Sequence, residues 1–407
     1  MTEKLLLKKQ KSLSSYLKNG GYEALKKALS SGQKAVLEEI SKSKLRGRGG
    51  AAFWASLKWE TVAAQMTSPK YVICNSDEGE PATFKDRYLW ENNPYQVIEG
   101  ITIAGYTVGA KKGFIYIRGE YRDIALRIEK MLAELRKKGY LGENILGSEF
   151  SFDIEVVMGS GAYVCGESSA ILNSIEGKRG EPRIKPPRTS VVGLFGKPTL
   201  VNNVETLSNV PLIVKNGGDW YASLGVGNST GPKLFSVSGF VKKPGVYEFE
   251  LGKITLGELI EAAGGVEGEF KGAMIGGGAA GFIVNEEFLD MPMDFDSAWD
   301  RGISLGTGDV IVLNKSVNLW KMLHNIAWFF EHESCGKCMP CRYGTHHARK
   351  IIEKILAGNG NEEDIEKLNR IARTVKIASI CGLGKSSMDA YLSAMKHFRE
   401  ELMGVIS

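Results

Sequence analysis

The sequence predicts an α/β domain built on a mainly parallel sheet, followed by a small α+β module and a helical C-terminal segment. Residues 46–215 alternate strand-like and helix-like segments, which is typical of a parallel sheet covered by helices. Residues 232–313 then read as strand, helix and strand, and from Asn318 onward the apolar spacing is helical. We therefore expect a Lys-rich helical lead-in and three domains, with bounds 1–45, 46–228, 229–314 and 315–407.

The elements of the first domain follow from apolar runs and their turn residues. Ligands in such folds bind beyond the carboxyl ends of the strands, so these ends are the first place to look for a site. Strands are expected at 71–74, 114–117 and 152–158, and helices at 94–110, at 121–138 before Gly139, and at 165–176.

The later elements are read in the same way. Thr255 is a good N-cap, and Asn361 precedes three acidic residues that suit the first turn of a helix. Strands are expected at 232–239 and 309–313, and helices at 255–263, 324–332, 343–356, 361–377 and 386–402.

Composition excludes several classes of protein. Of the 407 residues, 43% are hydrophobic and 24% charged, as in soluble folded enzymes and unlike disordered chains. No run approaches the roughly 18 apolar residues of a membrane span, and Leu5–Leu7 is too short for a secretory signal. A net charge of +5 does not call for nucleic acid. We expect a cytoplasmic protein, or one held peripherally on the cytoplasmic face of a membrane through a larger complex.

Cysteine spacing predicts an iron–sulfur centre. Cys335, Cys338 and Cys341 are separated by two residues each, and Cys381 follows within Ile-Cys-Gly-Leu-Gly. Zinc usually takes two separated pairs, whereas a triplet closed by one distant cysteine suits the four thiolates of a 4Fe-4S cluster. The remaining two cysteines are expected to be small buried hydrophobic residues: Cys74 and Cys165.

Four loops in the first domain have the composition of ligand-binding loops. The chain holds 49 glycines, well above the ordinary share of about 7%. One loop combines three glycines with two arginines, which suits an anion; a second is acidic and suits ribityl or ribose hydroxyls. The third joins a strand to a helix, and the fourth offers two amides and a hydroxyl. They are residues 45–51, 75–81, 159–167 and 201–206.

Together these motifs resemble one family. From about Gly20 the chain is similar to the NADH-oxidising flavoprotein subunit of respiratory complex I and to related subunits of NAD-linked hydrogenases and formate dehydrogenases. The resemblance is carried by Leu45-Arg-Gly-Arg-Gly-Gly50, Asp77-Glu78 with Glu80-Pro81, Gly161-Ala-Tyr163 with Cys165-Gly-Glu167, Val201-Asn-Asn-Val-Glu-Thr206, Ser334-Cys-Gly-Lys-Cys-Met-Pro-Cys-Arg342 and Ser379-Ile-Cys-Gly-Leu-Gly384.

The resemblance implies a Rossmann-like FMN domain, a β-grasp domain of the soluble-ligand-binding type, and a C-terminal bundle holding one 4Fe-4S cluster. It implies hydride transfer between NADH or NADPH and FMN, then single electrons passed to the cluster. Cys335, Cys338, Cys341 and Cys381 would be its ligands, and Lys58, Glu80 and Tyr163 would touch the reacting groups. The implied cofactor and nucleotide contacts are Gly47, Arg48, Gly49, Gly50, Phe53, Lys58, Asn75, Asp77, Glu78, Glu80, Tyr163, Gly166, Glu167, Ser168, Arg188, Asn202, Asn203 and Thr206.

The chain departs from the family on the nucleotide side. Ala52-Phe-Trp-Ala-Ser56 replaces Gly-Phe-Pro-Thr-Gly, Ser168 replaces a second glutamate, and Arg188 and Thr61 replace aromatic residues. Losing a glutamate and gaining an arginine favours a 2′-phosphate, hence NADPH. Two other interpretations stay open: Trp54 blocks the pocket, or the changes are neutral around an NADH site.

A single cluster needs an electron acceptor nearby. We therefore expect neighbouring iron–sulfur subunits, including a small thioredoxin-like 2Fe-2S subunit, with no nucleic acid and only indirect membrane contact. The alternative function is an electron-relay or scaffold subunit with a modified or lost nicotinamide site.

Overall fold

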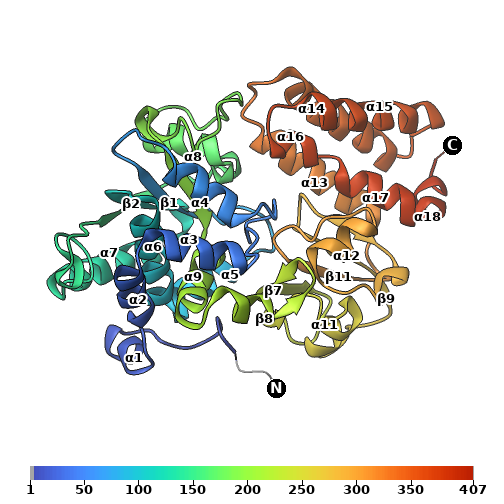
Figure 1. The fold of residues 1–407 in the computed structure, drawn as a ribbon. Coiled ribbons are helices and arrows are strands. Elements are labelled where there is room, and N and C mark those ends of the chain that lie inside the picture. Colours follow the sequence, from blue (N-terminus) through green and yellow to red (C-terminus); the bar gives the residue numbers. More distant parts are fainter. Residues whose placement is uncertain (1–3, 407) are drawn as a thin grey trace. The chain divides into compact units, whose positions relative to one another are not determined.

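The computed structural model describes residues 4–406 and consists of two compact units (Figure 1). We call them the first and the second unit. The first unit comprises Met1–Gly79, Phe84–Leu234 and Glu248–Lys253, and the second comprises Glu80–Thr83, Phe235–Tyr247 and Ile254–Ser407.

The first unit contains a four-stranded parallel sheet. Its strands are β1 (Tyr71–Ser76), β2 (Lys112–Ile117), β3 (Asp153–Met158) and β4 (Thr199–Asn203), in the order β3-β2-β1-β4. The expected parallel sheet is confirmed, and this order is that of a Rossmann-type half. The order reverses between β1 and β4, so the crevice at their carboxyl ends is where such sheets bind ligands.

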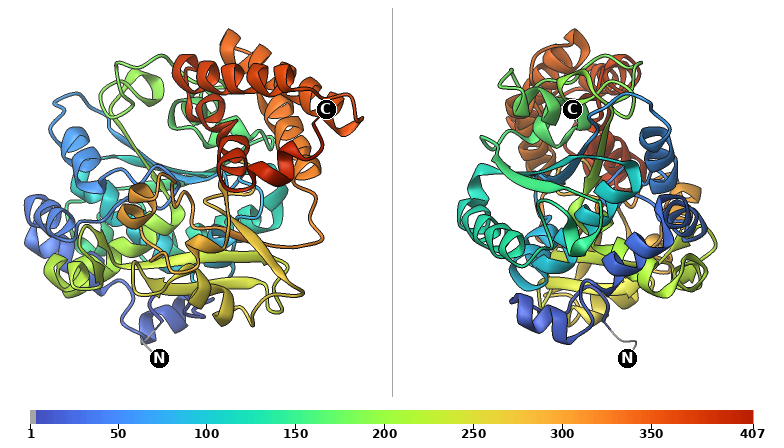
Figure 2. Two further views of the ribbon diagram at one scale, coloured as in Figure 1. Left: turned by 90° about the vertical axis from the view of Figure 1, so that its right-hand side faces the viewer. Right: turned by 60° about the vertical axis from the view of Figure 1, so that its left-hand side comes forward.

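Two helices of the first unit pack against each other and against β1: α6 (Pro94–Val108) and α9 (Val204–Asn216). Nearly every residue of α6 is buried. A Cβ on Gly100 would lie 2.0 Å from the Leu207 carbonyl oxygen, so only glycine permits this helix contact. Helix α7 (Arg122–Lys137) packs on β3, and α4 (Ala55–Ala63) on β4 (Figure 2).

The helical lead-in is part of the first unit. It contains α1 (Leu13–Lys18), α2 (Glu23–Ser31) and α3 (Gln33–Lys42). The buried Glu99 carboxylate accepts the backbone N–H groups of Tyr22 and Leu25, both at 2.9 Å. Glu248 accepts the backbone N–H groups of Leu5 and Leu7 at 2.7 and 2.8 Å. Buried carboxylates thus attach the N-terminal segment at two points.

The helix expected at 165–176 begins later than predicted. A 3₁₀ turn covers Tyr163–Gly166, and α8 spans Ser168–Ile175. The reason is local: the Glu167 carboxylate accepts the N–H groups of Ser169 and Ala170 at 2.8 and 3.0 Å, which makes Glu167 the N-cap.

A five-stranded mixed sheet follows, in the order β10-β9-β11-β7-β8. Strand β7 pairs with β11 in parallel, and β9 is antiparallel to both β10 and β11. Helix α11 (Leu256–Ala262) carries a capping box between Thr255 and Glu258, which confirms the predicted cap. The strands are β7 (Pro232–Gly239), β8 (Gly245–Glu250), β9 (Phe270–Ile275), β10 (Phe282–Val284) and β11 (Val310–Asn314).

The C-terminal part of the second unit is a helical bundle, orange to red in Figure 2. The prediction of one helix over 386–402 was wrong, because one helix already ends at Ser386 and two others, Asp389–His397 and Arg399–Met403, cover the rest. The Ser387 hydroxyl donates to the Gly384 carbonyl oxygen, and Met388 and Phe398 leave helical dihedral angles. The helices are α13 (Leu319–Glu333), α14 (Met339–Leu356), α15 (Glu362–Ala378), α16 (Gly382–Ser386), α17 (Asp389–His397) and α18 (Arg399–Met403).

The remaining elements are short. They are α5 (Lys85–Asn92), α10 (Gly218–Ala222), α12 (Phe295–Asp300), β5 (Gly225–Val226) and β6 (Ser229–Thr230). Among residues 4–406, no helix combines the length and the apolar character that crossing a membrane requires.

A buried ion network joins three elements of the first unit. Glu205 of α9 lies 3.0 Å from the Lys85 ammonium of α5 and 2.8 Å from that of Lys233 of β7. Lys85 also pairs with Asp86 at 2.7 Å. Burial alone would raise the pKa of Glu205, but Lys233 and Lys85 outweigh it and hold that pKa below its usual range.

Replacing Lys85 by methionine is expected to destabilise the first unit, because Asp86 and Glu205 would lose a buried counter-charge. The free energy of unfolding should fall by about 3–5 kcal/mol in urea denaturation. Lys112→Met is the matched control: Lys112 pairs with Glu155 at an exposed position, so the change should stay below about 1 kcal/mol. Equal losses in the two variants would contradict this view of the network.

Candidate functional site

Asparagines at the carboxyl ends of β1 and β4 organise the crevice where the strand order reverses. The Asn75 amide donates to the Gly166 carbonyl oxygen at 2.9 Å and accepts from the Asp77 N–H at 3.1 Å. The Asn202 amide oxygen accepts from the Trp59 indole at 3.0 Å. The bonds of Asn75 bring the acidic loop and the loop before α8 together.

The glycine–arginine loop meets the start of α9 at the same edge. The Arg48 backbone N–H donates to the Thr206 hydroxyl at 2.8 Å. A Cβ on Gly49 would lie 3.0 Å from the Cβ of Asn203, and Gly50 has a φ of 113°. A Cβ on Gly166 would likewise meet the Asp77 carbonyl oxygen at 3.5 Å. All four predicted loops therefore converge at one end of the parallel sheet.

The Arg48 side chain is bonded within the fold. Its guanidinium is fully buried and donates to the Thr230 carbonyl oxygen at 2.6 Å and to the Tyr221 hydroxyl at 3.3 Å. A buried guanidinium needs such acceptors to replace its water. A contact between the Arg48 side chain and a cofactor stays a prediction, while the Arg48 backbone N–H bonds to Thr206 at the crevice.

The Glu78 carboxylate supports the start of α5. It accepts the backbone N–H groups of Asp86 and Arg87 at 2.8 and 3.0 Å, and the Tyr121 hydroxyl at 3.1 Å. Burial, followed by the nearby Asp86 carboxylate, raises the pKa of Glu78 to about 8. Glu78 is thus a buried acid whose oxygens are bonded within the fold.

Cations surround Phe53, which the resemblance places at the nucleotide. The Lys58 ammonium lies 5.7 Å and the Arg188 guanidinium 5.6 Å from the centre of the Phe53 ring. Burial lowers the pKa of Lys58, and the charges of Lys185 and Arg188 lower it further. This side of the site is therefore strongly electropositive.

Lys185 is a site residue that sequence reasoning missed. Its ammonium pairs with the Glu167 carboxylate at 2.5 Å and lies 3.4 Å from the Ser168 hydroxyl. The Ser168 hydroxyl in turn donates to Glu167 at 3.1 Å. Residues 183–188 are rich in basic side chains, and this is the feature that could have pointed to the site. The sequence alone does not show that the fold brings Lys185 beside Glu167.

Glu80, the third residue expected at the reacting groups, belongs to the second unit, whereas Lys58 and Tyr163 belong to the first. Its carboxylate accepts the backbone N–H groups of Ala279 and Ala280 at 2.8 and 2.9 Å. A Cβ on Gly277 would lie 2.3 Å from the same carboxylate. A glycine loop after β9 therefore holds Glu80.

The four predicted cluster ligands lie at helix ends of the second unit. Cys335 lies in the loop after α13, Cys338 is the N-cap of α14, Cys341 lies in its first turn, and Cys381 is the N-cap of α16. Burial raises the pKa of Cys341 to about 11, and the other three cysteines add to this rise. The fold thus brings the four thiols near enough to influence one another.

The surroundings of these cysteines fit a cluster. A Cβ on Gly384 would lie 3.0 Å from the Cβ of Cys341 and 2.5 Å from the Ser379 hydroxyl oxygen. That Ser379 oxygen is buried and has no hydrogen-bond partner among the described residues. Within residues 4–406 no three His, Cys, Asp or Glu side chains are placed to hold a single metal ion; a cubane is larger than one ion, so this bears only on single-ion sites.

The other two cysteines are buried, as the sequence predicts. Cys74 and Cys165 are at most 5% exposed, and burial raises the pKa of the Cys74 thiol. Both belong to the first unit, whereas the four predicted ligands belong to the second.

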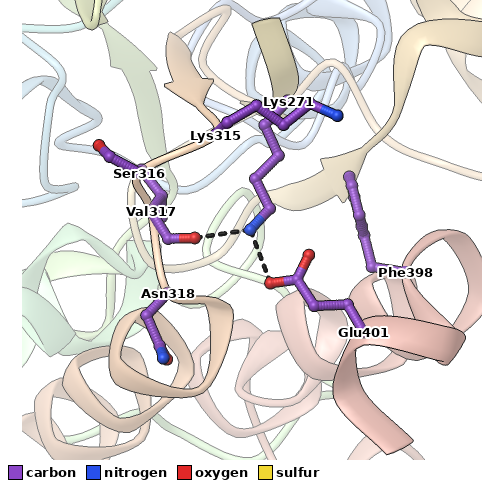
Figure 3. A pocket seen from close by; sticks show the side chains of 7 residues that line it. All are labelled: Lys271, Lys315, Ser316, Val317, Asn318, Phe398 and Glu401. Atoms are coloured by element: carbon purple, nitrogen blue, oxygen red, sulfur yellow. Dashed lines mark hydrogen bonds and ion pairs between the residues drawn. The ribbon is translucent and has the colours of Figure 1, made fainter. Parts of the chain in front are cut away.

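A separate cavity of about 430 Å³ lies in the second unit (Figure 3). Lys271 crosses it, donating to the Val317 carbonyl oxygen and pairing with Glu401, each at 2.6 Å. Phe398 lines the opposite wall. The lining includes none of the residues predicted to bind a cofactor or substrate.

Comparison with known proteins gives matches along most of the chain. The Nuo51 FMN-binding domain matches residues 40–212, the SLBB domain residues 234–271, and the NADH-ubiquinone oxidoreductase-F iron-sulfur binding region residues 321–404.

Two curated relatives cover nearly the full chain. The F subunit of NADH-quinone oxidoreductase from Aquifex aeolicus is 46% identical over 98% of this chain and 94% of its own. The F 2 subunit of the Rhizobium meliloti enzyme is 45% identical over 97% and 94%. A chain of an NAD⁺-reducing [NiFe]-hydrogenase in its H₂-reduced state superposes with a TM-score of 0.88 at 36% identity, covering 97% of this chain and 67% of that one.

The Rossmann-type strand order, the loops that converge at its crevice and the four cysteines agree with these matches. The chain belongs to the family of NADH-quinone oxidoreductase F subunits.

Proposed function

We propose that this chain is the flavoprotein subunit of an oxidoreductase complex, transferring a hydride between NAD(P)H and FMN and passing single electrons to a 4Fe-4S cluster. The observation that carries the proposal is the convergence of four polar, glycine-rich loops at the reversal point of the parallel sheet. FMN supplies the conversion between a two-electron donor and a one-electron acceptor.

The residues of the crevice fit FMN. The backbone N–H groups of Gly49 and Gly50 suit a phosphate, as does the Thr206 hydroxyl, whose proton stays available while its oxygen accepts the Arg48 N–H. Asn75 and Asp77 offer acceptors to hydroxyl groups, and Asn203 lies against Gly49. This chain binds and orients the two reactants; none of its side chains is required as an acid, base or nucleophile.

We infer that the nucleotide is held by the electropositive side of the site and that NADPH is accepted. Support comes from Lys58, Lys185 and Arg188, whose charges influence one another around Phe53. Lys185 partly neutralises Glu167 and lies beside Ser168. A 2′-phosphate placed there would meet cations and a hydroxyl in place of a second carboxylate.

We propose iron–sulfur subunits as partners, among them a small thioredoxin-like 2Fe-2S subunit, with any membrane contact made by the assembled complex. The relatives' names describe subunits of quinone-reducing complexes, and the structural neighbour is a hydrogenase chain. The isolated cluster of this chain needs an acceptor to which its electrons can pass.

Nucleotide choice tests the second proposal. Ser168→Glu should lower kcat/KM for NADPH about tenfold through charge repulsion and leave that for NADH nearly unchanged, as measured by steady-state flavin-dependent reduction of an artificial acceptor. Ser168→Ala, which adds no charge, is the control. If the unmodified protein is reduced well by NADH but only at background rates by NADPH, the proposal that it accepts NADPH is wrong.

The charge of Lys58 predicts a pH dependence. Because its pKa is lowered, Lys58 becomes neutral at a lower pH than an exposed lysine, and a neutral amine attracts nucleotide phosphates less. KM should therefore begin to rise at a pH below about 10.4, the ordinary pKa of lysine. Lys58→Arg keeps its charge and should flatten this limb; an identical rise in that variant would argue against a role for the Lys58 charge.

The ligand set is tested by Cys381→Ser, which removes one of four thiolates. Anaerobically reduced protein should lose the electron paramagnetic resonance signal of the 4Fe-4S cluster while retaining FMN. Cys74→Ala removes a buried thiol of the first unit and should keep the signal. An intact signal in Cys381→Ser would refute the assignment.

A further inference from the structure

Ser334 lies between the end of α13 and the first cluster cysteine. Its hydroxyl oxygen is 3.3 Å from the Cys341 sulfur and accepts the Gly336 backbone N–H at 3.3 Å. A hydroxyl carries one proton and an amide N–H can only donate. The Ser334 proton is therefore free to point at the Cys341 sulfur.

Ser379 occupies the corresponding place before the fourth cysteine. It ends α15, and its backbone N–H donates to the Val375 carbonyl oxygen. Its hydroxyl is buried without a partner among the described residues, although such groups are normally bonded. A Cβ on Gly384 would lie 2.5 Å from the Ser379 hydroxyl oxygen and 3.0 Å from the Cβ of Cys341, so these two side chains border the same small space beside Gly384. The hydroxyl thus lies beside Cys341, one of the four predicted ligands.

We propose that Ser334 and Ser379 are positioning residues for electron transfer: their hydroxyls donate hydrogen bonds to sulfur atoms of the cluster and raise its reduction potential. The inference rests on the proposed ligand set. When the cluster takes one electron from the reduced flavin, its sulfur atoms become more negative, so fixed O–H donors stabilise the reduced state more than the oxidised state. The protons stay on the serine oxygens.

The burial of Cys341 strengthens this effect. Its side chain is 5% exposed, so water contributes little to the stabilisation of added charge. Two neutral donors in this setting are expected to favour the reduced state without changing the number of thiolates or the overall charge of the site.

Potentiometric titration, monitored by electron paramagnetic resonance on the full chain, tests the proposal. Ser334→Ala and Ser379→Ala should each lower the equilibrium constant for reduction up to about tenfold, which corresponds to a fall of at most about 59 mV for one electron. Ser334→Thr keeps the hydroxyl and should stay near the unmodified value. Serines of α16 and its end provide controls: Ser386 donates to Gly382 and Ser387 to Gly384, so Ser386→Ala and Ser387→Ala should leave the potential unchanged.

Each outcome of the titration either supports or overturns the role proposed for the two serines. Unchanged potentials in both alanine variants with full cluster content would overturn the proposal. Loss of the cluster in both would show the serines to be structural, which also overturns it. A failure of the ligand assignment is separate, since it would appear as a cluster signal that survives in Cys381→Ser.

Discussion

The first unit depends on the buried carboxylate of Glu205. Glu205 lies at the start of α9, directly after β4, and it must be ionised to hold two buried lysines. Through Lys85 it fixes Asp86, which accepts the Asn203 amide at 2.5 Å. Because removing a partner from such a network leaves an uncompensated charge, α5, α9 and β7 keep one arrangement. The crevice at the sheet edge is therefore built on a rigid base.

Much of this architecture can be predicted from local pattern. Three predictions depend on residues that are close in sequence: the strand–helix alternation, the cap at Asn361 and the cysteine spacing. The structure has the parallel sheet and the Asn361 cap. Several elements were not predicted, among them α9 and the strands β8, β9 and β10, and two further cases show why. Strand β4 has only five residues and ends in two asparagines, which resemble a loop. The stretch after Cys381 has helical spacing, yet the Ser387 hydroxyl competes for the backbone and divides it.

The site was predictable in position but less so in the roles of side chains. A glycine-rich loop indicates that another part of the chain lies close to its backbone, and Gly49 does lie close to Asn203. The sequence does not tell whether an arginine in that loop faces a ligand or the interior, and Arg48 faces the interior because Thr230 and Tyr221, from a distant segment, supply its acceptors. Every residue except proline has a backbone N–H, so the sequence does not reveal which of them will bond to a side chain. The hydrogen bond from the Ala279 N–H to the Glu80 carboxylate is therefore known only from the structure.

The attachment of Leu5–Leu7 to Glu248 has a consequence for biosynthesis. Leu5 and Leu7 bond to a strand made some 240 residues later, and Glu248–Lys253 is itself a piece of the first unit. Domains generally fold as units during translation. This one is complete only after β8 has emerged from the exit tunnel, so the N-terminal segment reaches its final hydrogen bonds late in synthesis.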